Sequence, residues 1–334
     1  MKLKKRNIPF HEYLVTQQMG IDSSAGVTYR SDDTQGSQRM VRYSTSDLND
    51  GRNGPGIYET LSFIQEGASR HDLQTLKERT DWQYYGVRFF SEIIAGHGLE
   101  INELVRSSRK ELLDKAREYS GSDMVPLRMR YARDEKQPNL TLKRFDPSVQ
   151  EIRGIMRVDK KAGDPVYRKD IAPPPASVRQ GVIEETVSNW FPLVEPFISV
   201  PRPLGYIIPV NRADVIETLV DHCFQVGYIR EDMLVEVEGY QVSDLIPAEY
   251  DYLSPQTIEV EKKLMNILIK KGDFYISCGQ EGANLISCLL EPQSQYGLIR
   301  YWKYDLVPEK GDIFPFYRVI KKVNLPLVPF KDWN

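Results

Sequence analysis

The sequence predicts a mixed α/β fold in two parts, and two observations lead to this prediction. Residues 70–120 carry helical patterns, whereas short alternating segments typical of strands begin after about residue 125. The chain has 334 residues, which is enough for two ordinary domains. We place the boundary near residues 125–145 and expect one domain over residues 1–125 and an α+β domain over residues 126–334.

The first part is predicted to be a loop, a strand and two helices. Residues 21–56 are rich in Ser, Asp, Gly, Asn and Arg, which is typical of a long loop. The following segment, IYETLSFIQ (57–65), has the β-branched and aromatic composition of a short buried strand. Helices are expected over residues 70–95 and 100–119, separated by Gly96 and a second glycine.

The second part alternates between strands and helices. A proline-rich connection, APPPASVRQ, occupies residues 172–180. An amphipathic helix is predicted over residues 211–225, and a second helix begins at Gly282 and ends at Pro292. Strands are predicted at residues 125–132, 140–145, 202–210, 234–242 and 273–280.

The composition indicates a soluble globular protein, with 41% hydrophobic and 27% charged residues. The net charge of −3 gives no reason to expect nucleic acid or an anionic membrane as a partner. No stretch approaches the roughly 18 apolar residues of a membrane span. The basic start, MKLKKR, is followed by polar residues instead of the apolar core of a signal peptide. Localisation stays open, because a secreted or periplasmic protein would need an upstream part that carries such a signal.

The three cysteines, Cys223, Cys278 and Cys288, contain no C-x-x-C pair. This pattern argues against a disulfide framework and against a thiolate zinc cluster. We expect all three to be ordinary half-buried thiols.

Glu66 is the residue that the local pattern singles out. It follows the apolar run of the expected strand and precedes Gly67. A carboxylate at the end of a buried strand, next to a glycine, is a common way to present a general base to a cleft. The alternative is that Glu66 caps the turn after it, and the local pattern leaves both roles open.

Four segments resemble one enzyme family. The stretch DGRNGPGIYETLSFIQEG (50–67) resembles the segment with the catalytic glutamate in bacterial zinc carboxypeptidase-like proteins, the carboxypeptidase A-type metallopeptidases. RPLGYIIP resembles a strand in the C-terminal region of these proteins, and ANLISCLLEPQSQYGLIRY resembles their Leu-Glu-Pro-x-Ser-x-x-Gly-Leu segment. FPFYRV resembles their closing Tyr-Pro-x-x-Arg-Val. The matches follow the family's order and span roughly residues 40–320.

The resemblance implies that residues 1–125 form the C-terminal part of the family's mixed sheet with helices, followed by a smaller α+β domain. In the family a zinc ion is held by two histidines and a glutamate, and arginines bind the terminal carboxylate of the substrate. A separate glutamate activates the zinc-bound water, and Glu66 matches it. Tyr58 is near the place of the substrate-facing tyrosine, and Arg52 and Asn53 are expected to line the same cleft.

The zinc ligands of the family have no match in this chain. They precede the general base, whereas here only His11 precedes Glu66, and no glutamate follows His11 at the required spacing. The resemblance therefore implies zinc as the family's cofactor but no metal ligand in this chain alone. His97 and Glu100 have His-x-x-Glu spacing and His222 follows them, but all three come after Glu66. We expect His97 to be an exposed turn residue and His222 a packing residue of its helix.

Two functions are consistent with these predictions. The first is the C-terminal part of a zinc metallocarboxypeptidase-like hydrolase of peptides or proteins, inactive without an upstream half of the same polypeptide. The second is a non-catalytic pseudo-peptidase that binds peptides or cell-wall fragments. A module of the second kind has to cover the exposed sheet edge with its own first residues, and FHEYLVTQQMGI is the only apolar segment there. We therefore favour the first function.

Overall fold

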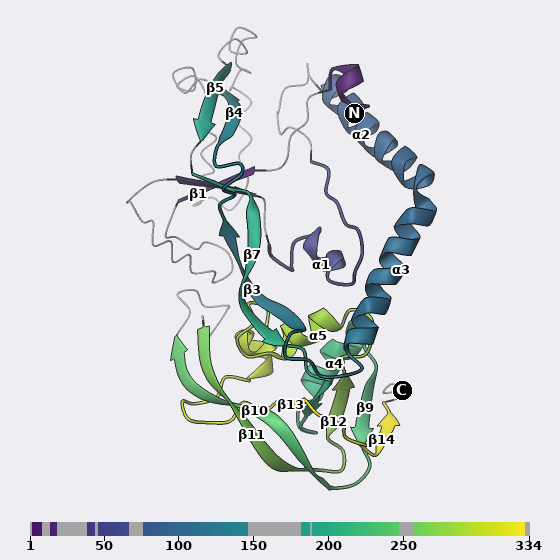
Figure 1. Cartoon of the computed structure of the whole chain (residues 1–334), viewed down its shortest axis with the longest axis vertical. Coiled ribbons are helices and arrows are strands. Elements are labelled where there is room, and N and C mark those ends of the chain that lie inside the picture. Colours follow the sequence, from purple (N-terminus) through teal and green to yellow (C-terminus); the bar gives the residue numbers. More distant parts are fainter. Residues whose placement is uncertain are drawn as a thin grey trace, which may run out of the picture.

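The computed structural model of the chain describes residues 2–8, 14–18, 39–43, 46–66, 76–145, 182–187, 189–246 and 257–330. Figure 1 shows a body at one end of the molecule, built on the largest sheet. A pair of helices and a β-ribbon extend from this body. The structure thus combines helices with a large antiparallel sheet, which confirms the mixed α/β content.

The body is built on a sheet of seven strands in the order β11-β10-β13-β8-β12-β9-β14. Every neighbouring pair in this sheet is antiparallel. The strands are β8 (Gly205–Ile208), β9 (Val226–Ile229), β10 (Met233–Ile246), β11 (Thr257–Ile269), β12 (Phe274–Ser277), β13 (Tyr317–Val319) and β14 (Leu327–Pro329).

Strand β8 lies at the centre of this sheet and is buried on both faces. Successive side chains of a strand point to opposite faces. Tyr206 and Ile208 accordingly pack into one hydrophobic core, whereas Ile207 packs into a second core on the other face. Burial on both faces explains why the strand is a continuous apolar run instead of an alternating one.

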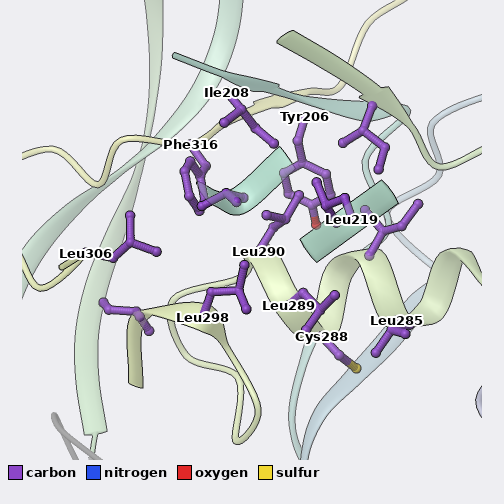
Figure 2. Close-up of a cluster of buried hydrophobic side chains, with 14 of the residues drawn as sticks. Tyr206, Ile208, Leu219, Leu285, Cys288, Leu289, Leu290, Leu298, Leu306 and Phe316 are labelled. Carbon is purple, nitrogen blue, oxygen red and sulfur yellow. The ribbon is translucent and has the colours of Figure 1, made fainter. Parts of the chain in front are cut away.

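Two amphipathic helices cover the larger core. They are α4 (Ala213–Asp221) and α5 (Ala283–Leu290), and every residue of α5 except Asn284 is buried. Figure 2 shows Leu290 of α5 pointing toward Tyr206 of β8, whereas Leu289 lies beside Cys288. The 3₁₀ turns η5 (Leu298–Arg300) and η6 (Trp302–Tyr304) follow α5. This packing confirms the predicted helices of the second part.

Smaller sheets lie beyond the body. Strands β3 and β7 form a long ribbon that leads from the body to the antiparallel pair of strands β4 and β5 (Figure 1). Strand β2 pairs antiparallel with β1 and parallel with β6. The bounds are β1 (Leu14–Gln18), β2 (Arg39–Tyr43), β3 (Met124–Ala132), β4 (Leu140–Phe145), β5 (Val182–Val187), β6 (Trp190–Phe191) and β7 (Leu193–Pro201).

Helices α2 (Leu76–Gly96) and α3 (Gly98–Lys115) form the second extension, as predicted. His97 joins them, since its N–H donates to the Ile93 carbonyl at 3.0 Å and its carbonyl accepts from Ile101 N–H at 2.9 Å. The far end of α3 meets the body, where Leu112 is buried in the larger core. A short α1 (Asn53–Gly56) and η1 (Lys4–Arg6) complete the described helices. None of the described helices is both long enough and apolar enough to span a membrane.

The predicted strand over residues 57–65 is wrong. Residues 57–59 form a turn after α1, and residues 60–66 have no regular structure. Leu61, Phe63 and Ile64, which the prediction buried, are 45–65% exposed. A strand satisfies its backbone N–H and C=O groups through a neighbouring strand, and no described strand pairs with this segment.

Candidate functional site

Glu66 ends a segment that runs beside helix α2. The Phe63 ring meets the Phe90 ring edge-on with centroids 5.1 Å apart, and Gln65 Nε2 donates to the Gln83 carbonyl at 3.0 Å. The Gln65 amide covers Gly86 so closely that any side chain at position 86 would collide with it. The Glu66 side chain itself is exposed, and within the described residues no hydrogen bond or ion pair reaches its carboxylate.

Several hydrogen bonds are internal to the loop that holds Arg52 and Asn53. The Asp50 carboxylate accepts from the Arg52 N–H at 2.9 Å and pairs with its guanidinium at 3.2 Å. Asn53 Nδ2 donates to the Asp47 carbonyl at 2.9 Å. The Asp47 carboxylate then accepts from the Tyr296 hydroxyl at 2.7 Å, which ties the loop to the body. Burial, reinforced by the Asp47 charge, raises the pKa of Tyr296 and keeps it a neutral donor.

Tyr58 fastens the same loop to the end of helix α4. Its hydroxyl lies 2.7 Å from Nδ1 of His222, and its carbonyl accepts from Arg109 of α3 at 3.3 Å. Its ring lies against Gly282, which has φ 72°, and a Cβ there would be 2.6 Å from the ring. Burial, followed by the neighbouring Cys223, raises the pKa of the Tyr58 hydroxyl.

Glu59 adds a contact at the start of helix α5. Its backbone has φ 53°, which an L-residue rarely adopts. This conformation brings the carboxylate within 3.4 Å of both the Gly282 N–H and Asn284 Nδ2, in the positive field of the helix N-terminus. Burial raises the pKa of Glu59. The sequence analysis did not single out Glu59, since its left-handed backbone has no signal in the sequence.

We call the contacts of Asp47, Tyr58 and Glu59 with the body the loop clamp. The clamp ends where the segment with Glu66 begins, so it fixes the starting point of residues 60–66. Glu66 has no described hydrogen bond or ion pair to Arg52, Asn53 or Tyr58. Substrate binding by those three residues stays a prediction, and the polar groups described for them bond within the chain.

The histidines with metal-like spacing lie in two different places. His97 Nδ1 lies 2.9 Å from the Glu100 carboxylate at the α2–α3 junction, and both side chains are exposed. His222 instead bonds to Tyr58 at the body. Across the described ranges no three His, Cys, Asp or Glu side chains are grouped so that they could hold a metal ion. His11 and His71 lie outside the described residues.

A buried polar cluster surrounds Glu291, directly after helix α5. Its carboxylate accepts from the Tyr206 hydroxyl at 2.7 Å and the Tyr240 hydroxyl at 2.6 Å, and it lies 3.0 Å from Arg318 Nε. Arg318 also pairs with Glu238. Burial, reinforced by the Glu291 charge, raises the pKa of both tyrosines, so they remain neutral donors.

The position of this cluster agrees with a structural, helix-end role for Glu291 in the Leu-Glu-Pro segment. Glu291 is 1% exposed and Arg318 is fully buried, so neither can meet a substrate from solvent. Tyr206 belongs to the RPLGYIIP segment and Arg318 to the FPFYRV segment, so three of the sequence segments that resemble the peptidase family meet here. Comparison with known proteins found no match for the chain among family models, curated proteins or solved structures.

Proposed function

We propose that this chain acts as the C-terminal part of a zinc metallocarboxypeptidase-like peptide hydrolase, in which Glu66 is the general base. The order of the four segments that resemble the family supports the proposal, together with one structural observation. Glu66 presents a free, exposed carboxylate beside an apolar run, Leu61, Phe63 and Ile64, that is itself 45–65% exposed. Apolar, β-forming residues left uncovered in this way are typical of a surface that another polypeptide segment covers.

The described residues do not by themselves fit a zinc ion, because no described trio of ligands is grouped. The proposal therefore assigns the metal to a further segment of polypeptide and assigns two tasks to this chain. The loop clamp holds the base-bearing segment at the body, and the Glu66 carboxylate accepts the proton of the attacking water.

The carboxypeptidase-like arrangement of the sheet belongs to the same proposal. In that arrangement residues 60–66 pair with a strand of the additional segment, which would give them the regular structure that they lack here. The division of the chain into residues 1–125 and 126–334 is likewise part of the proposal.

The test compares the natural protein with its Glu66→Gln variant, using peptides with free C-termini as substrates. We expect hydrolysis to fall by about 10²–10⁴-fold, the usual contribution of a general base, while the zinc content measured by elemental analysis is unchanged. Glu100→Gln serves as the matched control, because Glu100 is equally exposed but lies at the α2–α3 junction. Hydrolysis that survives Glu66→Gln would refute the assignment. Peptide binding without any hydrolysis in the unaltered protein would leave the non-catalytic alternative.

A further inference from the structure

Helix α2 carries a face without charged residues along its whole length. At 3.6 residues per turn, eight of its residues fall within an arc of about 120°. The large apolar side chains among them are 40–57% exposed. We call this face the α2 stripe, and its members are Leu76, Thr80, Gln83, Tyr84, Val87, Phe90, Ser91 and Ile94.

The other side of α2 is already covered by the first residues of the chain. The Arg6 guanidinium lies 4.0 Å from the centre of the Tyr85 ring, and Lys2 pairs with Glu92 at 2.6 Å. Figure 1 shows α2 extending away from the body, with the N-terminus beside it. Among the described residues, the α2 stripe is therefore the exposed face of this helix. It is touched along one edge by Phe63, which meets Phe90, and by Gln65, which bonds to Gln83.

The order of residues in the stripe is nearly symmetric about Val87. Tyr84 and Phe90 lie three residues to either side, Gln83 and Ser91 four, and Thr80 and Ile94 seven. An antiparallel helix pair with a two-fold axis at Val87 would bring each Tyr84 against the Phe90 of the second copy. Such a face is complementary to itself, which is the requirement for a closed two-fold interface.

Charge does not oppose pairing between identical helices, because all eight members of the stripe are uncharged. Along one border of the stripe the charges are paired within the helix, Lys77 with Asp81 at 2.6 Å and Arg88 with Glu92 at 3.0 Å, and Arg79 lies along the other border. The uncharged face lets two copies approach, although each chain carries a net charge of −3.

The exposed area suits a small interface. A large aromatic side chain presents roughly 150–250 Å² when fully free. The five half-exposed apolar members of the stripe therefore leave roughly 500 Å² of apolar surface uncovered. This area is below the roughly 800 Å² per partner of a standard interface and is in the range of weaker, reversible pairs.

We propose that the α2 stripe is a dimerisation surface, which pairs antiparallel with the same stripe of a second copy around an axis near Val87. The proposal is independent of any peptidase activity, because neither Glu66 nor a metal takes part in it.

The test measures the molar mass of the full chain by light scattering and sedimentation up to about 100 µM, a range that covers micromolar dissociation constants. We expect a dimer whose dissociation constant rises at least tenfold in Val87→Glu and in Ile94→Glu. Leu99→Glu is the matched control: Leu99 is 89% exposed on α3, off the stripe, and its replacement should leave the dimer intact. Far-UV circular dichroism checks that each variant stays folded.

A cross-linking experiment locates the axis independently of these variants. In a Cys223→Ser background, Val87→Cys should form a disulfide-linked dimer on addition of diamide, which takes up the two hydrogens of the thiols. Leu99→Cys should remain monomeric in the same gel. The proposal is overturned if the unaltered chain is monomeric or forms a larger assembly, if Val87→Glu and Ile94→Glu leave the dimer intact, or if Leu99→Cys cross-links as fast as Val87→Cys.

Discussion

Replacing Glu291 with alanine removes the centre of the buried polar cluster. The carboxylate is 1% exposed and bonds to two tyrosine hydroxyls and Arg318. Without it the Tyr240 hydroxyl loses its described acceptor, whereas Tyr206 keeps Ser287 at 3.1 Å. Arg318 keeps Glu238 as its remaining counter-charge.

The magnitude can be worked out from these losses. Removing one partner of a buried ion pair typically costs about 3–5 kcal/mol, because the other charge stays buried. An unsatisfied buried hydroxyl costs about 1–3 kcal/mol more, and the remaining Glu238 pair offsets part of the total. We therefore expect Glu291→Ala to lower the free energy of unfolding by about 3–5 kcal/mol and the melting temperature by roughly 10 °C.

Urea titration and differential scanning calorimetry measure both quantities. Glu291→Gln keeps the shape and one acceptor oxygen, so its loss should be smaller than that of alanine. Glu309→Ala removes the same charge at an exposed position and should change the free energy by less than about 0.5 kcal/mol. The reasoning fails if Glu291→Ala is as stable as this control, since that result would mean that the cluster contributes nothing net.

Two further predictions concern titratable groups. Burial raises the pKa of the Cys278 and Cys288 thiols to about 12, whereas Cys223 is exposed. One thiol of three should therefore react with Ellman's reagent at about pH 8 in the folded chain, and all three should react after denaturation. Fast reaction of a second thiol in the folded chain would contradict the described burial. Burial also raises the pKa of Glu59 in the folded chain above its ordinary value of 4.5. As the pH rises from 4.5 toward this raised pKa, the unfolded chain therefore releases the proton before the folded chain does, and the free energy of unfolding falls. Glutamine has no such proton to release, so Glu59→Gln should match the unaltered chain near pH 4 and be more stable near pH 7. The gain should be less than about 1 kcal/mol because the group is half exposed. A lower urea midpoint of the variant near pH 7 would refute this.

The helices could be predicted from the sequence because their signals are local. Apolar residues at helical spacing and the glycines between α2 and α3 are visible in the chain itself, as is Pro292 after α5. Strand β11 was missed, since its mixture of Glu, Lys and apolar residues at the edge of the sheet gives a weak pattern. The segment 57–65 failed for the opposite reason. It has the residues of a strand, but strands depend on partners that the local pattern cannot supply.

The sequence could nominate Glu66 but could not predict the contacts around it. Glu66 stays a prediction, drawn from a local pattern and from the resemblance of one segment, whereas the loop clamp depends on pairs far apart in the chain. Tyr58 meets His222, and Asp47 meets Tyr296, across 164 and 249 positions. No spacing rule connects such residues, so only the folded chain reveals that they hold the same loop.

The buried cluster around Glu291 also sets the order in which the body can mature during synthesis. Arg318 bonds to the carbonyl of Pro201, 117 positions earlier, and to Glu238, 80 positions earlier. At roughly 5–20 residues per second, the ribosome adds Arg318 about 6–23 s after Pro201. Until then Glu291 has no described cation to accompany it out of water, whereas Glu238 already has Lys262 at 3.8 Å. A buried carboxylate without a counter-charge is strongly disfavoured, so the core around Glu291 is expected to close only after β13 has emerged.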